Sequence, residues 1–141
     1  HGRGPRTIER SKDLGEYLKK RQVGRIFAST EVKAVETAEI AAKVVGVPNV
    51  IQDRDLREHD RDNMPTPSGF DRQSLVIECM RKPDDLIWGS ETVSTARIRF
   101  GSAVSRLLEN VHGDETVAIV AHGTVITTFV GEILDIDSVP I

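Results

Sequence analysis

A histidine that ends an apolar segment is the residue of this chain best placed for chemistry. Residues 117–121 form a short apolar run, and His122, Gly123 and the start of a helical pattern follow it directly. We interpret the run as a fully buried strand. Ligands bind at the carboxyl ends of strands in open α/β sheets, and free N–H groups at a helix N-terminus attract anions. The pattern predicts an anion site at His122, and a histidine that merely finishes a strand is the alternative.

A second strand-to-helix junction carries hydroxyl groups and a cation. The predicted strand over residues 25–29 runs into Ser29 and Thr30, and Lys33 lies in the first turn of the next predicted helix. Hydroxyls, free N–H groups and an ammonium group together suit a phosphoryl group. A cation at a helix N-terminus opposes the macrodipole, so we expect an anion near Lys33. The alternative is that Thr30 caps the helix and Lys33 is solvated.

The polar segment over residues 53–70 offers groups for acid–base chemistry. It is rich in charge, proline and glycine, and we expect a long loop with little regular structure. Its central residues are Arg57, Glu58, His59, Asp60 and Arg61. A carboxylic acid beside a buried site can donate a proton to a leaving group. The alternative is a charged, solvated loop.

The order of elements predicts the framework that positions these residues. Helical patterns cover residues 8–23, 33–45, 68–80, 93–108 and 124–134, and short strands cover 25–29, 49–52 and 117–121. In the segment over residues 88–92, Thr92 as the N-cap of the fourth helix explains most of the pattern. The alternation of strands and helices predicts an α/β fold, a three-layer sandwich with a mostly parallel central sheet flanked by helices.

The composition excludes several classes of protein. The chain has 141 residues, which favours a single domain over residues 1–141, and its net charge of −3 without a basic block argues against nucleic-acid binding. No apolar stretch approaches the roughly 18 residues of a membrane span. The lone Cys79 excludes an internal disulfide, and its apolar neighbours predict a buried helix residue rather than a nucleophile. Because the predicted strands are few, we expect the domain to lack its first strand and its C-terminal end.

Four segments in order resemble motifs of the histidine phosphatase superfamily, which includes the cofactor-dependent phosphoglycerate mutases. Ala28–Ala38 is similar to the family's Ser-Ser-Pro-x-x-Arg-Ala-x-Gln-Thr-Ala. Leu56–Glu58 is similar to Leu-x-Glu, whose glutamate is the proton donor in many members. Gly89–Thr92 is similar to Gly-Gly-Glu-Ser, and Val120–Gly123 to Val-Ser-His-Gly, which holds the second catalytic histidine. Together the matches cover residues from about 14 to 134.

The departures from the family pattern concern phosphate binding and the nucleophile. Lys33 stands where the family has an arginine, so it supplies charge without a bidentate fork. Glu31 replaces the proline of the motif. The family's nucleophile lies in Arg-His-Gly after a strand, and His1, which precedes Gly2, is the candidate here. The nucleophile is otherwise missing from this sequence, because we place His112 in a turn far from the site.

The resemblance implies a phosphomonoester hydrolase with a phosphohistidine intermediate, or a mutase-like phosphotransferase. Glu58 would be the proton donor, preferred to Asp60 because Glu58 matches the glutamate of Leu-x-Glu and because Arg57 and Arg61 are expected to keep Asp60 ionised. Lys33 and His122 would hold the phosphoryl oxygens. No metal and no cofactor are expected, and the partner would be a small phosphorylated substrate in the cytoplasm.

Two other functions stay open. One is a catalytically inactive family member that binds a phosphorylated ligand or a protein partner. The other is an unrelated anion-binding module, in which Lys33, Glu58 and His122 would lie apart. The sequence does not predict an oligomeric state.

Overall fold

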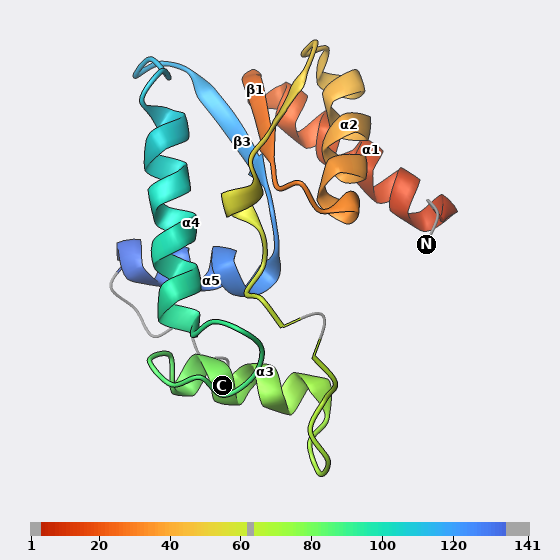
Figure 1. Cartoon of the computed structure of the whole chain (residues 1–141). Helices are drawn as coiled ribbons and strands as arrows, with labels where there is room; N and C mark the ends of the chain where they lie inside the picture. Colours follow the sequence, from red (N-terminus) through yellow and green to blue (C-terminus); the bar gives the residue numbers. More distant parts are fainter. Residues whose placement is uncertain (1–3, 62–63, 135–141) are drawn as a thin grey trace.

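The chain folds into helices packed around a short parallel sheet, as the computed structural model shows (Figure 1). The structure describes residues 4–61 and 64–134. The helices are α1 (Pro5–Lys20), α2 (Val32–Val45), α3 (Arg72–Arg81), α4 (Val93–Leu108) and α5 (Gly123–Leu134). The strands are β1 (Val23–Ala28), β2 (Val50–Gln52) and β3 (Thr116–Val120), in the sheet order β2-β1-β3. Both strand pairings are parallel, which confirms the predicted sheet.

Side chains on alternate positions of the strands pack against different helices, which makes three layers. Ile26 and Ala28 of β1 lie in one core with residues of α1 and α2. Phe27, between them in sequence, lies in the second core with residues of α4 and α5. In Figure 1 these helix pairs lie on opposite sides of β1 and β3, which confirms the predicted sandwich. A strand covered on both faces needs apolar residues at consecutive positions, as β1 has.

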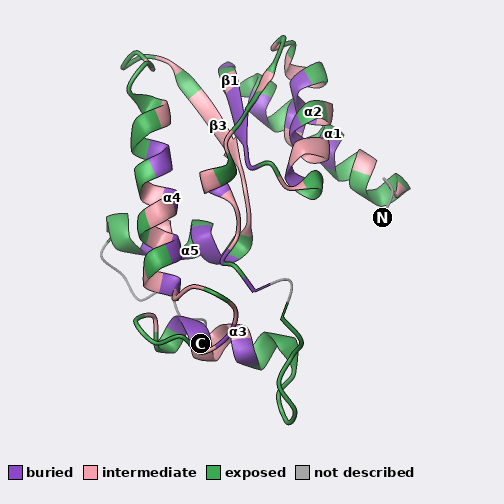
Figure 2. Ribbon diagram, viewed as in Figure 1, coloured by how far each residue is buried: buried purple, intermediate pink, exposed green. Residues whose placement is uncertain are grey.

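The third strand is less buried than the sequence predicts. Within β1, Ile26, Phe27 and Ala28 are at most 2% exposed, whereas no residue of β3 is fully buried and Thr116 is exposed. Figure 2 shows the contrast between the two strands. The expectation of a fully buried strand is wrong because β3 is an edge strand of the described sheet and pairs with β1 alone. An apolar run by itself does not distinguish central from edge positions.

Helix ends differ from the predicted ones where a local cap decides them. The helix predicted to continue to Val23 ends at Lys20, because Gln22 adopts a left-handed conformation (φ 56°) and turns the chain into β1. The third helix begins at Arg72 rather than at residue 68, since the side chain of Asp71 accepts from the Ser74 N–H at 2.7 Å. The predicted cap of α4 is confirmed, and Thr92 Oγ1 accepts from the Thr95 N–H.

The long polar segment and α3 lie beyond one end of the sheet (Figure 1). A single 3₁₀ turn, Arg54–Leu56, interrupts the irregular path that the sequence predicts there. Helix α3 packs through Leu75 and Cys79 against Trp88. Cys79 is buried, as expected, and this burial raises the pKa of its thiol. Within the described ranges, no helix combines the length and apolarity needed to cross a membrane.

Candidate active site

The parallel pairing of β1 and β3 places the carboxyl ends of both strands at the same end of the sheet. The N-termini of the two helices that follow these strands lie there as well. Ala28 lies opposite Val120 in the register, and the Ser29 N–H donates to the Val120 carbonyl at 3.1 Å. From that end the chain continues into α2 after β1 and into α5 after β3. Ser29 and His122 therefore meet, and their Oγ and Nε2 atoms lie 2.7 Å apart.

The imidazole of His122 makes two contacts through the same nitrogen. Nε2 lies 2.7 Å from Ser29 Oγ and 2.6 Å from Glu31 Oε2. A carboxylate only accepts, so Nε2 carries a proton and donates it to Glu31. In a serine–histidine–carboxylate triad the carboxylate holds the other ring nitrogen. The arrangement therefore makes His122 a hydrogen-bond donor at the sheet edge and does not activate Ser29 as a nucleophile.

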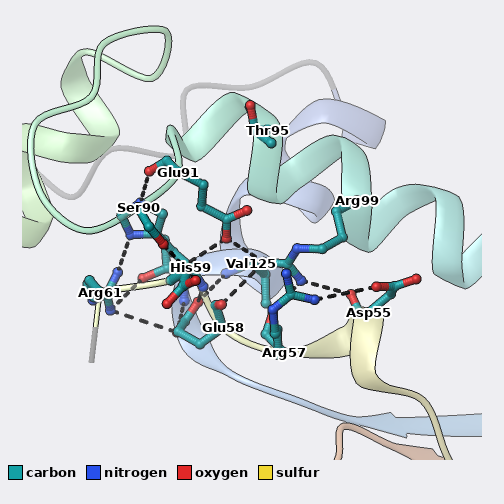
Figure 3. A network of polar contacts seen from close by, with 12 residues as sticks. Asp55, Arg57, Glu58, His59, Arg61, Ser90, Glu91, Thr95, Arg99 and Val125 are labelled. Atoms are coloured by element: carbon teal, nitrogen blue, oxygen red, sulfur yellow. Dashed lines mark hydrogen bonds and ion pairs between the residues drawn. The ribbon is translucent and has the colours of Figure 1, made fainter. Parts of the chain in front are cut away.

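The carboxyl group of Glu58 caps the N-terminus of α5. Its Oε1 accepts from the backbone N–H groups of His59 and Val125 at 2.9 and 3.0 Å, and its Oε2 accepts from that of Thr124 at 3.0 Å. The first N–H groups of a helix have no partner within the helix and carry the positive end of its dipole. Figure 3 shows Glu58, on the loop that also carries His59, together with Val125. The helix that follows His122 thus holds Glu58 in a fixed orientation.

Two polar residues of the same loop are buried, contrary to the interpretation of a solvated loop. His59 is 1% exposed and Arg61 is 6% exposed. His59 donates from Nε2 to the Glu91 carbonyl at 2.7 Å, so its Nδ1 accepts from Arg61 Nη1 at 3.1 Å. Arg61 Nη2 donates to Thr124 Oγ1 at 3.2 Å and lies 3.9 Å from Glu58 Oε2.

The second candidate carboxyl group, that of Asp60, faces away from this cluster. Asp60 is exposed and its Oδ2 accepts from Ser90 Oγ at 2.7 Å. The two arginines expected to keep Asp60 ionised have other partners: Arg57 pairs with Asp55 at 3.4 Å, and Arg61 donates to His59 and Thr124.

The segment Gly89–Thr92 braces the loop, a role that the helix cap alone does not explain. Gly89 has a φ of 85°, and a Cβ there would lie 2.0 Å from the Asp60 carbonyl oxygen. The Ser90 N–H donates to that same oxygen at 2.8 Å, and Glu91 Oε1 accepts from the Asp60 N–H at 3.0 Å. Only glycine allows so close an approach in this conformation. Hydrogen bonds therefore join the segment Gly89–Thr92 directly to the backbone of the loop that carries Glu58.

An arginine of α4 completes the brace. Arg99 donates to the carbonyl groups of Asp55, Arg57 and Glu58 and forms an ion pair with Glu91 at 2.7 Å (Figure 3). One rigid helix thus fixes the backbone of the turn and of the loop together. Neither pattern nor composition marks Arg99 for this role, because the three carbonyl groups to which it donates lie more than 40 residues away in sequence.

Side chains predicted for the site line one cavity of about 940 Å³. Lys33, Glu58 and His122 all line it. Lys33 lies at the second position of α2, behind an N-cap that is Glu31, so the expectation of a Thr30 cap is wrong. The carboxylate residues that line the same cavity are Glu31, Glu36 and Glu58. The cavity is also lined by Thr7, Glu31, Val32, Glu36, Arg61, Arg72, Ala121 and Gly123.

His112, unlike His122, is not among the residues that line the cavity. His112 precedes β3 and is exposed at the end of the strand opposite to His122, as expected of a turn residue. His1 lies outside the described residues. Among the residues the structure describes, no cluster of histidine, cysteine or carboxylate side chains has the makings of a metal site.

Comparison with known proteins identifies relatives over most of the chain. A family model, the histidine phosphatase superfamily (branch 1), matches residues 5–139. Phosphoglycerate mutase-like protein 4 of Arabidopsis thaliana is 28% identical over 125 residues, which are 84% of this chain and 54% of the relative. The chain therefore spans about half the length of this curated relative.

Solved structures share the fold. YhfR of Bacillus stearothermophilus has a TM-score of 0.73 at 25% identity, over 94% of this chain and 67% of that one. A mycobacterial glucosyl-3-phosphoglycerate phosphatase has a TM-score of 0.70 at 22% identity, over 96% and 70% of the two chains. A phosphoserine phosphatase from Entamoeba histolytica has a TM-score of 0.72 at 16% identity, over 96% and 68%. These structures are similar to the chain in architecture.

Proposed function

Because the chain belongs to the histidine phosphatase superfamily, we propose that it hydrolyses small phosphomonoesters through a phosphohistidine intermediate. The observation that carries this proposal is that Lys33, Glu58 and His122 line one cavity. An unrelated anion-binding module gives no reason for these three groups to converge. The proposal includes a cytoplasmic enzyme that needs neither a metal ion nor another cofactor.

Lys33 and His122 hold the phosphoryl group in this mechanism. The ammonium group and the Nε2–H donor bind the equatorial oxygens, where negative charge is greatest in the transition state. In the structure the Nε2 proton is donated to Glu31 at 2.6 Å. A phosphoryl oxygen that takes this bond therefore displaces the Glu31 carboxylate.

Glu58 transfers the proton, and its contacts leave one position for it. Oε1 already accepts two N–H bonds, whereas Oε2 accepts one. A protonated carboxyl group with the hydrogen on Oε2 keeps all three bonds, since a hydroxyl oxygen still accepts. The proton passes from Oε2 to the leaving alcohol as the phosphorus–oxygen bond breaks. Glu58 then takes a proton from the water that hydrolyses the phosphohistidine.

The nucleophile is a histidine whose ring nitrogen forms the bond to phosphorus. His1 is the candidate within this sequence, on its resemblance to the histidine of Arg-His-Gly. In the other version of the proposal, the nucleophile lies in a longer protein of which this sequence is a part. The complete reading frame decides between them: an Arg-His-Gly after a predicted strand identifies the nucleophile upstream.

Hydrolysis is preferred to a mutase reaction. The loop over residues 53–70 carries no large insertion. Two proteins with similar structures are named as phosphatases, one of glucosyl-3-phosphoglycerate and one of phosphoserine. Both names describe monoesters of small molecules, which supports that class of substrate here.

The test is hydrolysis of p-nitrophenyl phosphate with a metal chelator present. We expect turnover by the chain, loss of turnover in His122→Ala, and unchanged turnover in the matched control His112→Ala. Equal activity of the two variants would make His122 merely structural.

An inactive member that binds a phosphorylated ligand is the second candidate. The absence of an Arg-His-Gly motif from this sequence favours it, because Lys33 and His122 can bind a phosphoryl group without a nucleophile. This candidate predicts binding of phosphate, seen as chemical-shift changes at Gly123 and Thr124, without turnover of any monoester.

A further inference from the structure

Arg61 is a buried cation that has no role in the proposed mechanism. Its side chain is 7% exposed, and its Nε is buried without a hydrogen-bond partner among the described residues. Burying a guanidinium group in this way costs stability unless a nearby anion compensates its charge. Among the described residues, the ion pair of Arg61 is with Glu58, whose side chain is 12% exposed.

The neighbours of Arg61 aim its guanidinium group without neutralising it. His59 donates from Nε2 to the Glu91 carbonyl, so the uncharged lone pair of Nδ1 accepts from Arg61 Nη1 at 3.1 Å. Thr124 accepts from Nη2 through its hydroxyl and donates its own N–H to Glu58 Oε2. A carboxylate in place of either residue would neutralise the charge of Arg61. Two neutral acceptors instead leave that charge facing Glu58.

The oxygen that faces Arg61 is the one with room for a proton. Nη2 lies 3.9 Å from Oε2, beyond a hydrogen bond but close enough for a strong charge interaction in a buried site. When Oε2 gives its proton to a leaving group, the negative charge develops at that oxygen. Arg61 is placed to stabilise the product of this step and not the protonated carboxyl group that precedes it.

We propose that Arg61 is the positioning residue of Glu58, which holds the carboxyl group against α5 and stabilises the carboxylate that proton donation produces. The role of Glu58 as proton donor rests on the proposed function. The charge interaction between Arg61 and Glu58 does not rest on the proposed function, because it follows from the 3.9 Å distance between Nη2 and Oε2. The two claims therefore need separate measurements.

The charged groups around Glu58 come from several elements. Besides Arg61, Arg99 of α4 donates to the Glu58 carbonyl and Glu31 accepts from the Glu58 N–H. The other charged or titratable residues that line the cavity with Glu58 are Lys33, Glu36, Arg72 and His122. They stay unchanged when Arg61 alone is replaced. A change in the titration of Glu58 then reports the loss of Arg61.

The test compares Arg61→Gln with the matched control Arg57→Gln. Glutamine keeps a donor for His59 but removes the charge, and Arg57 lies in the same loop with Asp55 as its partner. We expect the ¹³C NMR signal of the Glu58 carboxyl group to titrate at a higher pH in Arg61→Gln than in the unchanged chain, and at the same pH in Arg57→Gln. The limiting kcat/KM for an alkyl phosphate falls about tenfold in Arg61→Gln, and that for p-nitrophenyl phosphate much less.

Arg61→Lys keeps the charge but lacks the fork that reaches His59 and Thr124 together. We expect it to retain the wild-type titration of Glu58 with a reduced kcat for alkyl phosphates. An unchanged titration in Arg61→Gln, or an equal loss with both substrates, would overturn the proposal. If Arg61→Gln does not fold, an unchanged kcat in Arg61→Lys contradicts it. If the protein from the complete reading frame hydrolyses nothing, the proposed function fails, and the NMR titration alone decides the role of Arg61.

Discussion

A methyl group added at Gly89 tests whether the segment Gly89–Thr92 braces the loop of Glu58. The new Cβ would lie 2.0 Å from the Asp60 carbonyl oxygen and 2.8 Å from Arg61 Cα, both backbone atoms. Neither atom can swing away as a flexible side chain does. The backbone of Asp60 and Arg61 must therefore move, and Glu58 moves with it.

The cost of this substitution has two parts that a control variant separates. Gly89 and Gly46 have nearly the same φ, 85° and 91°, but nothing lies within 4 Å of a Cβ at Gly46. Gly46→Ala therefore costs only the left-handed conformation, about 1–2 kcal/mol. Gly89→Ala adds a clash of the overpacking kind, about 1–3 kcal/mol more. We expect the total for Gly89→Ala to be about 2–5 kcal/mol.

Urea unfolding of both variants measures the difference in the free energy of unfolding. Turnover of an alkyl phosphate, assayed below the unfolding transition, should fall in Gly89→Ala and stay near the wild-type value in Gly46→Ala. Equal destabilisation of the two variants would refute the close approach of the two segments. A destabilised Gly89→Ala with full activity would refute the bracing of Glu58.

Three further outcomes are expected. Glu31→Ala should lower the KM for p-nitrophenyl phosphate about tenfold, because a partly exposed charge-assisted hydrogen bond no longer competes with the phosphoryl group; an unchanged KM would contradict the displacement of Glu31. The hydrogen bond from Arg106 holds the pKa of Asp53 below its usual value of 3.8, so this side chain stabilises the fold above that pH and loses the effect as the pH falls through the lowered pKa. Melting temperatures of wild type and Asp53→Asn should therefore differ at pH 6 and converge in acid below pH 3.8; a constant gap would contradict this. Cys79 should react with a thiol reagent at pH 8 only after unfolding, because burial raises its pKa; rapid reaction of the folded chain would show that it is accessible.

Local signals in the sequence predict most of the helices and the sheet edge that holds the site. Thr92 and Gly46 mark the ends of their helices through bonds to neighbouring residues, so the pattern of a few residues suffices. The end of α1 depends on the left-handed conformation of Gln22, and glutamine is not a residue type that indicates a turn. The exposure of β3 depends on which strands lie beside it, which no pattern within the strand encodes.

In the candidate site, too, some residues can be predicted from local sequence signals and others cannot. Lys33 and His122 follow strands, and neighbouring parallel strands end on the same side of the sheet, so their place in one cavity is predictable. The burial of His59 and Arg61 depends on Glu91 and Thr124, which lie 32 and 63 residues away from them in sequence. A loop has no periodicity that separates buried from solvated polar residues. The sequence therefore does not indicate that these two residues are buried, although it places both of them beside Glu58.

The role of Glu58 as proton donor is the claim on which the account of this site depends. Its most direct test is the ratio of kcat/KM values for p-nitrophenyl phosphate and an alkyl phosphate in Glu58→Gln, with Asp60→Asn as the matched control. A poor leaving group needs protonation and a good one departs without it. We expect the ratio to rise about 100-fold or more in Glu58→Gln and to stay at the wild-type value in Asp60→Asn. A rise in Asp60→Asn alone, or equal losses for both substrates in Glu58→Gln, would contradict the account.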